Sequence, residues 1–152
     1  MKALSEYFKS MYAWAILLLL LCAAASSYAV KVFPASLFTA IAACAIFDLT
    51  VKKLFLKREL RFPSSAVITG VIIGSIAPLN AAPVVVLVAS AVAIASKYAV
   101  RLKGRHIFNP ATLGLLAALS LFRLGDMWWA ASSIVWIAGF AVPLTLLLIV
   151  AN

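Results

Sequence analysis

Long apolar segments, separated by short connections that hold the charges and most of the prolines, constrain this chain more than any other feature of its sequence. Hydrophobic residues make up 66% of the 152 positions and charged residues only 11%, whereas a soluble domain carries about 25% charge. A helix that crosses a bilayer needs roughly 20 mostly apolar residues, so the chain has room for about six spans. The sequence therefore predicts an all-α fold, a polytopic membrane helix bundle that forms a single transmembrane domain over residues 1–152.

Prolines, glycines and charges set the limits of the predicted spans. We expect spans over residues 12–30, 35–51, 64–77, 84–100, 110–121 and 127–150. The third and fifth are short, and short spans interrupted by Gly or Pro often mark a binding site in membrane proteins. The third span also contains Gly70 and Gly74, a spacing that lets helix backbones approach closely. This span is therefore predicted to lie inside the bundle.

The positive charges are distributed unequally between the two sides that alternating spans would create. Eleven of the thirteen Lys and Arg residues fall on the side of the N-terminus, and the exceptions are Lys31 and Arg123. By the positive-inside rule we expect a multi-pass protein of the cytoplasmic membrane with both termini in the cytoplasm. The net charge of +9 does not indicate a nucleic-acid partner, because the cations lie between apolar runs. Membrane lipid is the expected surrounding.

Few residues could carry chemistry, since the chain has one His and four carboxylates and lacks a Gly-rich phosphate loop. Hydrolysis and group transfer are not expected. Asp48 and Lys97 lie at the same predicted depth, where either charge alone would be uncompensated. We predict that they form an ion pair, with a role in proton or ion movement as the alternative. Cys22 and Cys44 share a mid-span depth and are predicted to pack, the alternative being an iron–sulfur cluster held between two copies of the chain.

Residues 101–114 join a basic patch directly to the start of the fifth span. Pro110 suits the first position of a helix, because it has no backbone N–H and a fitting φ, and Asn109 suits the cap before it. The free N–H groups of this helix start would lie beside four polar or basic residues, Asn109, His106, Arg105 and Lys103. They could bind an electron-rich or anionic ligand. The alternative is a capped helix whose flanking cations only mark the membrane surface.

Several features of residues 64–114 resemble one family of membrane proteins in order and spacing. They are Ser-Ser-Ala-Val-Ile-Thr-Gly at 64–70, a Pro-containing turn, a span that ends in Lys97, and Gly-Arg-His-Ile-Phe-Asn-Pro-Ala-Thr-Leu-Gly at 104–114. The chain is similar to the first half of the family that supplies one membrane component of the Rnf electron-transport complex and its counterpart in the sodium-pumping NADH:quinone oxidoreductase. The similarity extends over roughly residues 12–129.

This resemblance implies a non-covalent flavin, either riboflavin or FMN. Thr69, Asn109 and Trp129 match flavin-contacting positions of the family, and His106 stands where the family has a further Asn. A covalent flavin is not expected, because residues 122–133 lack the Ser/Thr-Gly-Ala-Thr motif that carries it. The family proteins have a second half with inverted topology. The unequal charge on the two sides of this chain argues against insertion of two copies in opposite orientations. If the chain dimerises, we therefore expect a parallel homodimer.

We therefore expect a membrane electron-transfer protein that relays electrons between a cytoplasmic donor and a membrane acceptor. It would work with redox partner subunits, as a carrier within an oxidoreductase rather than as a self-contained enzyme. A transporter or channel, for flavin itself among other solutes, is the alternative, because short spans with sunken helix starts are also transporter architecture. A purely structural assembly protein is the third hypothesis.

Overall fold

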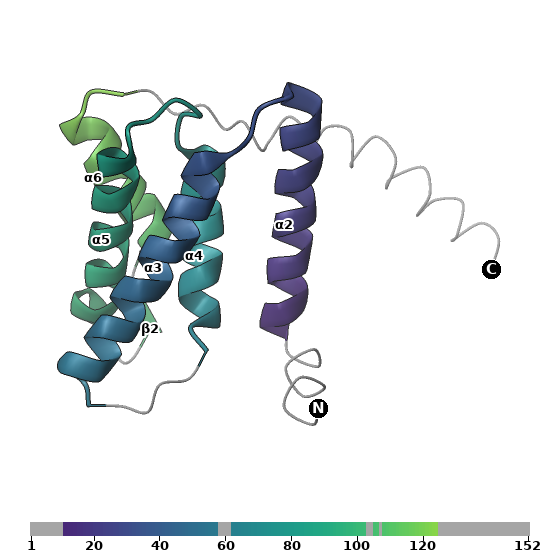
Figure 1. Cartoon of the computed structure of the whole chain (residues 1–152). Helices are drawn as coiled ribbons and strands as arrows, with labels where there is room; N and C mark the ends of the chain where they lie inside the picture. Colours follow the sequence, from purple (N-terminus) through teal and green to yellow (C-terminus); the bar gives the residue numbers. More distant parts are fainter. Residues whose placement is uncertain (1–10, 58–61, 103–104, 107, 125–152) are drawn as a thin grey trace, which may run out of the picture.

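The computed structural model describes residues 11–57, 62–102, 105–106 and 108–124, and within them the chain is a helix bundle with one pair of two-residue strands (Figure 1). Its five helices are α2 (Met11–Val30), α3 (Ala35–Leu54), α4 (Ser64–Ile76), α5 (Pro83–Ala99) and α6 (Pro110–Leu121). A short antiparallel pair, β1 (Arg101–Leu102) and β2 (Arg105–His106), joins α5 to α6. The helices coincide with the first five predicted spans, which confirms those predictions as helices. The sixth predicted span, residues 127–150, lies outside the described residues.

Two of these helices, α2 and α3, are long and apolar enough to cross a membrane. The other three are apolar but shorter, with 13 residues in α4, 17 in α5 and 12 in α6. Pro34, Pro63 and Ala82 precede α3, α4 and α5, and none of these positions forms a side-chain cap. Asn109, before α6, does form one.

Successive helices run in opposite directions, so their connections gather at two ends of the bundle (Figure 1). One end, called the basic end here, holds the last turns of α3 and α5, the β-strand pair and the first turns of α2, α4 and α6. Its cations on described backbone are Lys52, Lys53, Lys57, Lys97, Arg101 and Arg105. The other end, called the opposite end, holds residues 31–34, 77–82 and 122–124, with Lys31 and Arg123 as its cations.

Glycines allow the closest helix contacts. A Cβ atom on Gly70 would lie 2.6 Å from Ile41 Cα, and one on Gly74 would overlap Leu37 Cα. The Gly70–Gly74 face is therefore pressed against the backbone of α3, as its spacing predicted. On α6, a Cβ atom on Gly114 would overlap the carbonyl oxygen of Ala89, so the absence of a side chain lets α6 lie against α5.

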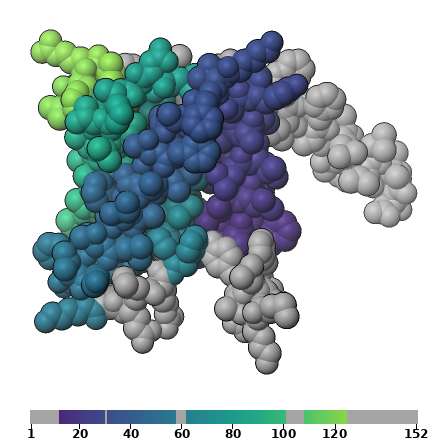
Figure 2. All heavy atoms as spheres, viewed as in Figure 1, coloured from purple at the N-terminus to yellow at the C-terminus, as the bar shows by residue number. Residues whose placement is uncertain are grey.

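Many of the side chains buried where helices meet are small, although Ile73 and Ile94 are also fully buried. Ala40, Ala89, Ala93, Ala111 and Ala118 are buried where helices meet. Several large apolar side chains of α2 and α3 instead face outward, among them Trp14, Leu18 and Ile46. Figure 2 shows the resulting arrangement, in which α3 (blue) crosses the face of the bundle between α2 (purple) and the later helices (teal and green). Helix α2 packs mainly on α4.

Candidate functional site

The start of α6 has the predicted cap. Asn109 adopts an extended backbone, and its side-chain oxygen accepts a hydrogen bond of 3.0 Å from the Ala111 N–H. Pro110 occupies the first helical position, where its missing N–H costs nothing. Because the Asn109 oxygen is used by the cap, its amide nitrogen is left to donate to a ligand.

Thr69 lies in the second turn of α4 and is buried. Its hydroxyl donates a hydrogen bond of 2.9 Å to the backbone carbonyl oxygen of Ser65. A hydroxyl that donates within its own helix still has lone pairs with which to accept. Gly70, the next residue, holds this part of α4 against α3.

Thr69 and Asn109, 40 positions apart in sequence, line the same pocket. This pocket, called the cap pocket here, has a volume of about 420 Å³ and lies between the first turn of α2, residues 65–72 of α4 and the start of α6. It is lined by Tyr12, Ser65, Ile68, Thr69, Ile72, Phe108, Asn109 and Pro110. Aromatic rings, polar side chains and an apolar wall therefore surround one space at the basic end of the bundle.

The other two predicted site residues are placed less fully. The backbone of His106 belongs to β2, where it pairs with Arg101 at the basic end. Its side chain, and the whole of Trp129, lie outside the described residues. Sequence reasoning missed Tyr12 and Phe108, both of which line the cap pocket. Phe108 could have been found, because an aromatic residue directly before a helix cap lies beside the helix start.

A second pocket adjoins the cap pocket along α6. It has a volume of about 650 Å³, and it shares Ile72 and Asn109 with the cap pocket. It continues between α4 and α6, past Leu116 and Ser120, to Arg123 at the opposite end. The two pockets together follow α6 over its whole length, because α6 packs closely on α5 and only lightly on α4.

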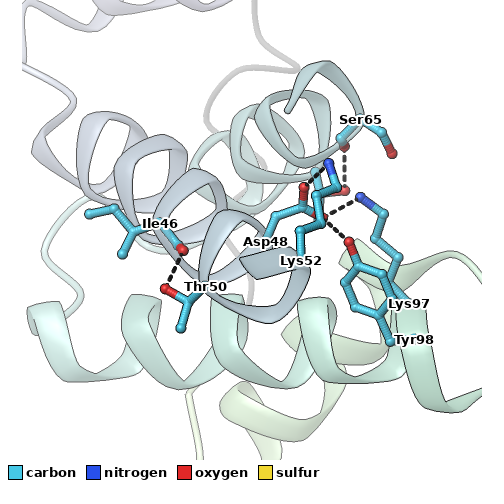
Figure 3. Close-up of polar contacts among 8 residues, drawn as sticks. Ile46, Asp48, Thr50, Lys52, Ser65, Lys97 and Tyr98 are labelled. Atoms are coloured by element: carbon cyan, nitrogen blue, oxygen red, sulfur yellow. Dashed lines mark hydrogen bonds and ion pairs between the residues drawn. The ribbon is translucent and has the colours of Figure 1, made fainter. Parts of the chain in front are cut away.

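A buried ion cluster lies between α3 and α5 (Figure 3), and none of its residues lines the cap pocket or the second pocket. The fully buried carboxylate of Asp48 accepts hydrogen bonds of 2.8 Å from Lys97 Nζ and 2.7 Å from the Tyr98 hydroxyl. Lys52 Nζ lies 2.5 Å from its second oxygen. The predicted pairing of Asp48 with Lys97 is confirmed. Lys52 was missed, although its position four residues after Asp48 on one helix was a usable signal.

The two cysteines, on α2 and α3, differ in their surroundings within the residues that the structure describes. Cys44 is buried in the main core cluster, and Cys22 is half-buried on α2. No group of three or more His, Cys, Asp or Glu side chains there could hold a metal ion. The packing role predicted for Cys44 agrees with its place in the core.

Comparison with known proteins adds no identification: no family model, curated protein or solved structure matches this chain.

Proposed function

We propose that the chain is an integral membrane protein whose helices cross the cytoplasmic membrane as a multi-pass bundle. The two long apolar helices support this proposal, and so does the exposure of Trp14, Leu18 and Ile46, each more than half exposed. A water-soluble protein rarely exposes contiguous apolar surface of this kind, whereas lipid tails accommodate it. Small residues at the helix contacts are also typical of membrane bundles. In this proposal residues 127–150 add the sixth span, and both termini are cytoplasmic.

We further propose that the cap pocket binds a flavin, riboflavin or FMN, without a covalent bond. The observation that carries this proposal is the meeting of Thr69 and Asn109 in one pocket. The pyrimidine edge of a flavin presents two carbonyl acceptors and one N–H donor. The Asn109 amide nitrogen can donate to a flavin carbonyl, and the Thr69 hydroxyl oxygen can accept from the flavin N–H. Sites for small molecules commonly combine an apolar wall with a few such polar groups in a volume of roughly 300–1,000 Å³.

The surroundings of the cap pocket suit a redox cofactor. Tyr12 and Phe108 supply aromatic faces for a planar ring. The free N–H groups at the start of α6 and the cations of the basic end create a positive potential, which favours an anionic reduced ring. A bound flavin would accept and donate electrons, and the chain would fix its position and tune its potential.

The proposed function is therefore an electron carrier that takes electrons from a cytoplasmic donor and passes them to an acceptor in the membrane. The cap pocket at the basic end supports this direction, because the basic end is the one assigned to the cytoplasm by charge. His106 and Trp129 remain proposed contacts through the resemblance to the Rnf and sodium-pumping families. Redox partner subunits, and a parallel homodimer, belong to the same proposal.

A transporter, for flavin itself among other solutes, is the second candidate. The specific observation that favours it is the second pocket, which continues the cap pocket from Asn109 to Arg123 at the opposite end. A carrier of electrons needs only a bound cofactor at one depth, whereas a transporter needs a route along the bundle. The two hypotheses differ in whether flavin stays bound during turnover.

The absorption spectrum of protein purified in mild detergent tests the proposal. We expect flavin bands, and release of riboflavin or FMN without proteolysis on denaturation. Thr69→Val removes the hydroxyl at constant shape, and Asn109→Ser keeps a capping oxygen while removing the amide. Each variant should purify with several-fold less flavin. Asn80→Ala, in an exposed turn at the opposite end, is the matched control and should keep the wild-type content.

Redox behaviour then separates the two candidates. Bound flavin that is reduced by a cytoplasmic-side donor and reoxidised from within the membrane, without leaving the protein, supports the carrier. Uptake of labelled riboflavin into proteoliposomes supports the transporter. A wild-type protein that neither contains flavin nor binds added riboflavin would show that both flavin hypotheses are wrong.

A further inference from the structure

The two cations of the opposite end share an unusual backbone position. Lys31 has φ 54° and Arg123 has φ 52°, and each follows the last residues of a helix, α2 or α6. The N–H groups of Lys31 and Val32 bond to the carbonyl oxygens of Tyr28 and Ser27. In the same pattern, the N–H groups of Arg123 and Leu124 donate to the carbonyl oxygens of Ser120 and Leu119. Both helices thus end in a Schellman motif, at the position where glycine is the usual residue.

Each of these cations also lies at the mouth of an apolar groove. Arg123 lines the second pocket, whose walls along α4 and α6 include Ile76, Leu116 and Leu119. Lys31 lines a pocket of about 530 Å³ between α2 and α3, whose walls include Leu20 and Phe38. Within the described part of the chain, neither cation forms an ion pair or hydrogen bond through its side chain.

We propose that Lys31 and Arg123 each bind the phosphate of an anionic phospholipid, with an acyl chain lying in the groove beside it. The charge of the cation complements the phosphate, and the groove offers the chain an apolar surface that faces the bilayer. A glycine in either position would end the helix with less steric cost, so in both places a cationic side chain occupies a backbone conformation that favours glycine. Two sites of the same design, on different helix pairs, carry the inference independently.

This inference rests on the membrane insertion proposed above and not on the flavin site. A cation that only neutralised the dipole of its helix would stabilise the protein equally in any lipid. A phosphate-binding cation instead makes the protein prefer anionic over zwitterionic phospholipid. A contact between one Lys or Arg and an anionic headgroup contributes about fivefold in affinity at the surface of a membrane.

Native mass spectrometry of the full chain, released from detergent that contains phosphatidylglycerol and phosphatidylcholine, tests the proposal. We expect wild type to retain phosphatidylglycerol about fivefold better than phosphatidylcholine at each of two sites. Lys31→Gln and Arg123→Gln should each abolish that preference at one site. Lys57→Gln is the matched control, because Lys57 is also a cation with positive φ (47°) but lines neither groove. Arg123→Gly removes the cation but suits the positive φ at the end of α6. It replaces Arg123→Gln in the experiment if that variant folds poorly.

Equal retention of the two lipids by wild type, or an unchanged preference in the variants, would overturn the proposal. Displacement of phosphatidylglycerol by inorganic phosphate would also overturn it, because the site would then bind a simple anion. A photoreactive group at Leu116 identifies the occupant of the α4–α6 groove. Cross-links to lipid support the proposal, whereas cross-links to residues 127–150 or to a second copy contradict it. Failure to retain any phospholipid would instead count against membrane insertion, and flavin content in the same samples is measured separately.

Discussion

Lys97 Nζ lies 2.8 Å from the carboxylate of Asp48, 49 positions earlier in the chain, and both side chains are buried between α3 and α5. The contact joins two helices that are not consecutive, in the interior of the bundle, where either charge alone would be costly. The Tyr98 hydroxyl donates a further hydrogen bond to this carboxylate, and Lys52 forms a second ion pair with it. Asp48 therefore holds together three donors, two of them cations, and of these Lys97 has less access to solvent than Lys52.

Removing the carboxylate charge should destabilise the bundle strongly. In Asp48→Asn the buried Lys97 ammonium loses its counter-charge, and breaking a buried pair typically costs about 3–5 kcal/mol. The double variant Asp48→Asn/Lys97→Met leaves no buried charge uncompensated and should recover most of that loss. The free energy of unfolding in detergent, measured for both single variants and the double, checks the prediction. A double variant as unstable as the sum of the single ones would contradict it.

Gly114→Ala should destabilise the contact between α5 and α6. At an unconstrained helix position the exchange of Gly for Ala would stabilise by about 1 kcal/mol. Here the new methyl group would overlap the backbone oxygen of Ala89, and a backbone cannot move aside cheaply. We expect a net loss of about 1–2 kcal/mol from overpacking, measured by unfolding in detergent. Gly114→Ala protein that is more stable than wild type would show that the helices do not approach this closely.

Two substitutions of Asn109 can separate its role as a helix cap from its proposed contact with a ligand. Asn109→Ala removes the acceptor for the Ala111 N–H and should lower stability by about 1 kcal/mol, with or without flavin. Asn109→Ser should retain most of this stability, because serine is also a good cap. Thermal unfolding of flavin-free protein makes the comparison. If the Ser and Ala variants are equally unstable, the side-chain cap contributes little.

The orientation of the bundle can be tested by labelling single cysteines from outside the cell. In a background of Cys22→Ser and Cys44→Ala, Asn80→Cys at the opposite end should react with an impermeant maleimide in intact cells. Lys57→Cys at the basic end should react only after lysis, because the cations of that end are expected in the cytoplasm. Reversed accessibility would place the basic end outside and would contradict the predicted topology.

The sequence by itself determined the helices, because prolines and charges end them without any need for tertiary contacts. Pro110 starts α6 with Asn109 as its cap, and the basic stretch after Leu54 cannot continue an apolar span. The pairing of Asp48 with Lys97 was also predictable, since two buried opposite charges at equal depth have few other ways to be compensated.

Tertiary structure alone decided where the bundle is closed and where it opens. Gly114 brings α6 onto α5, and Gly70 and Gly74 bring α4 onto α3, so α4 and α6 contact each other only lightly. The pockets beside Asn109 lie in the space between them. Spacing in a sequence shows which residues are small, but which neighbour a small face packs against depends on the simultaneous fit of all the helices. For the same reason, the position of Tyr12 in the sequence did not reveal that this residue of α2 lines the cap pocket.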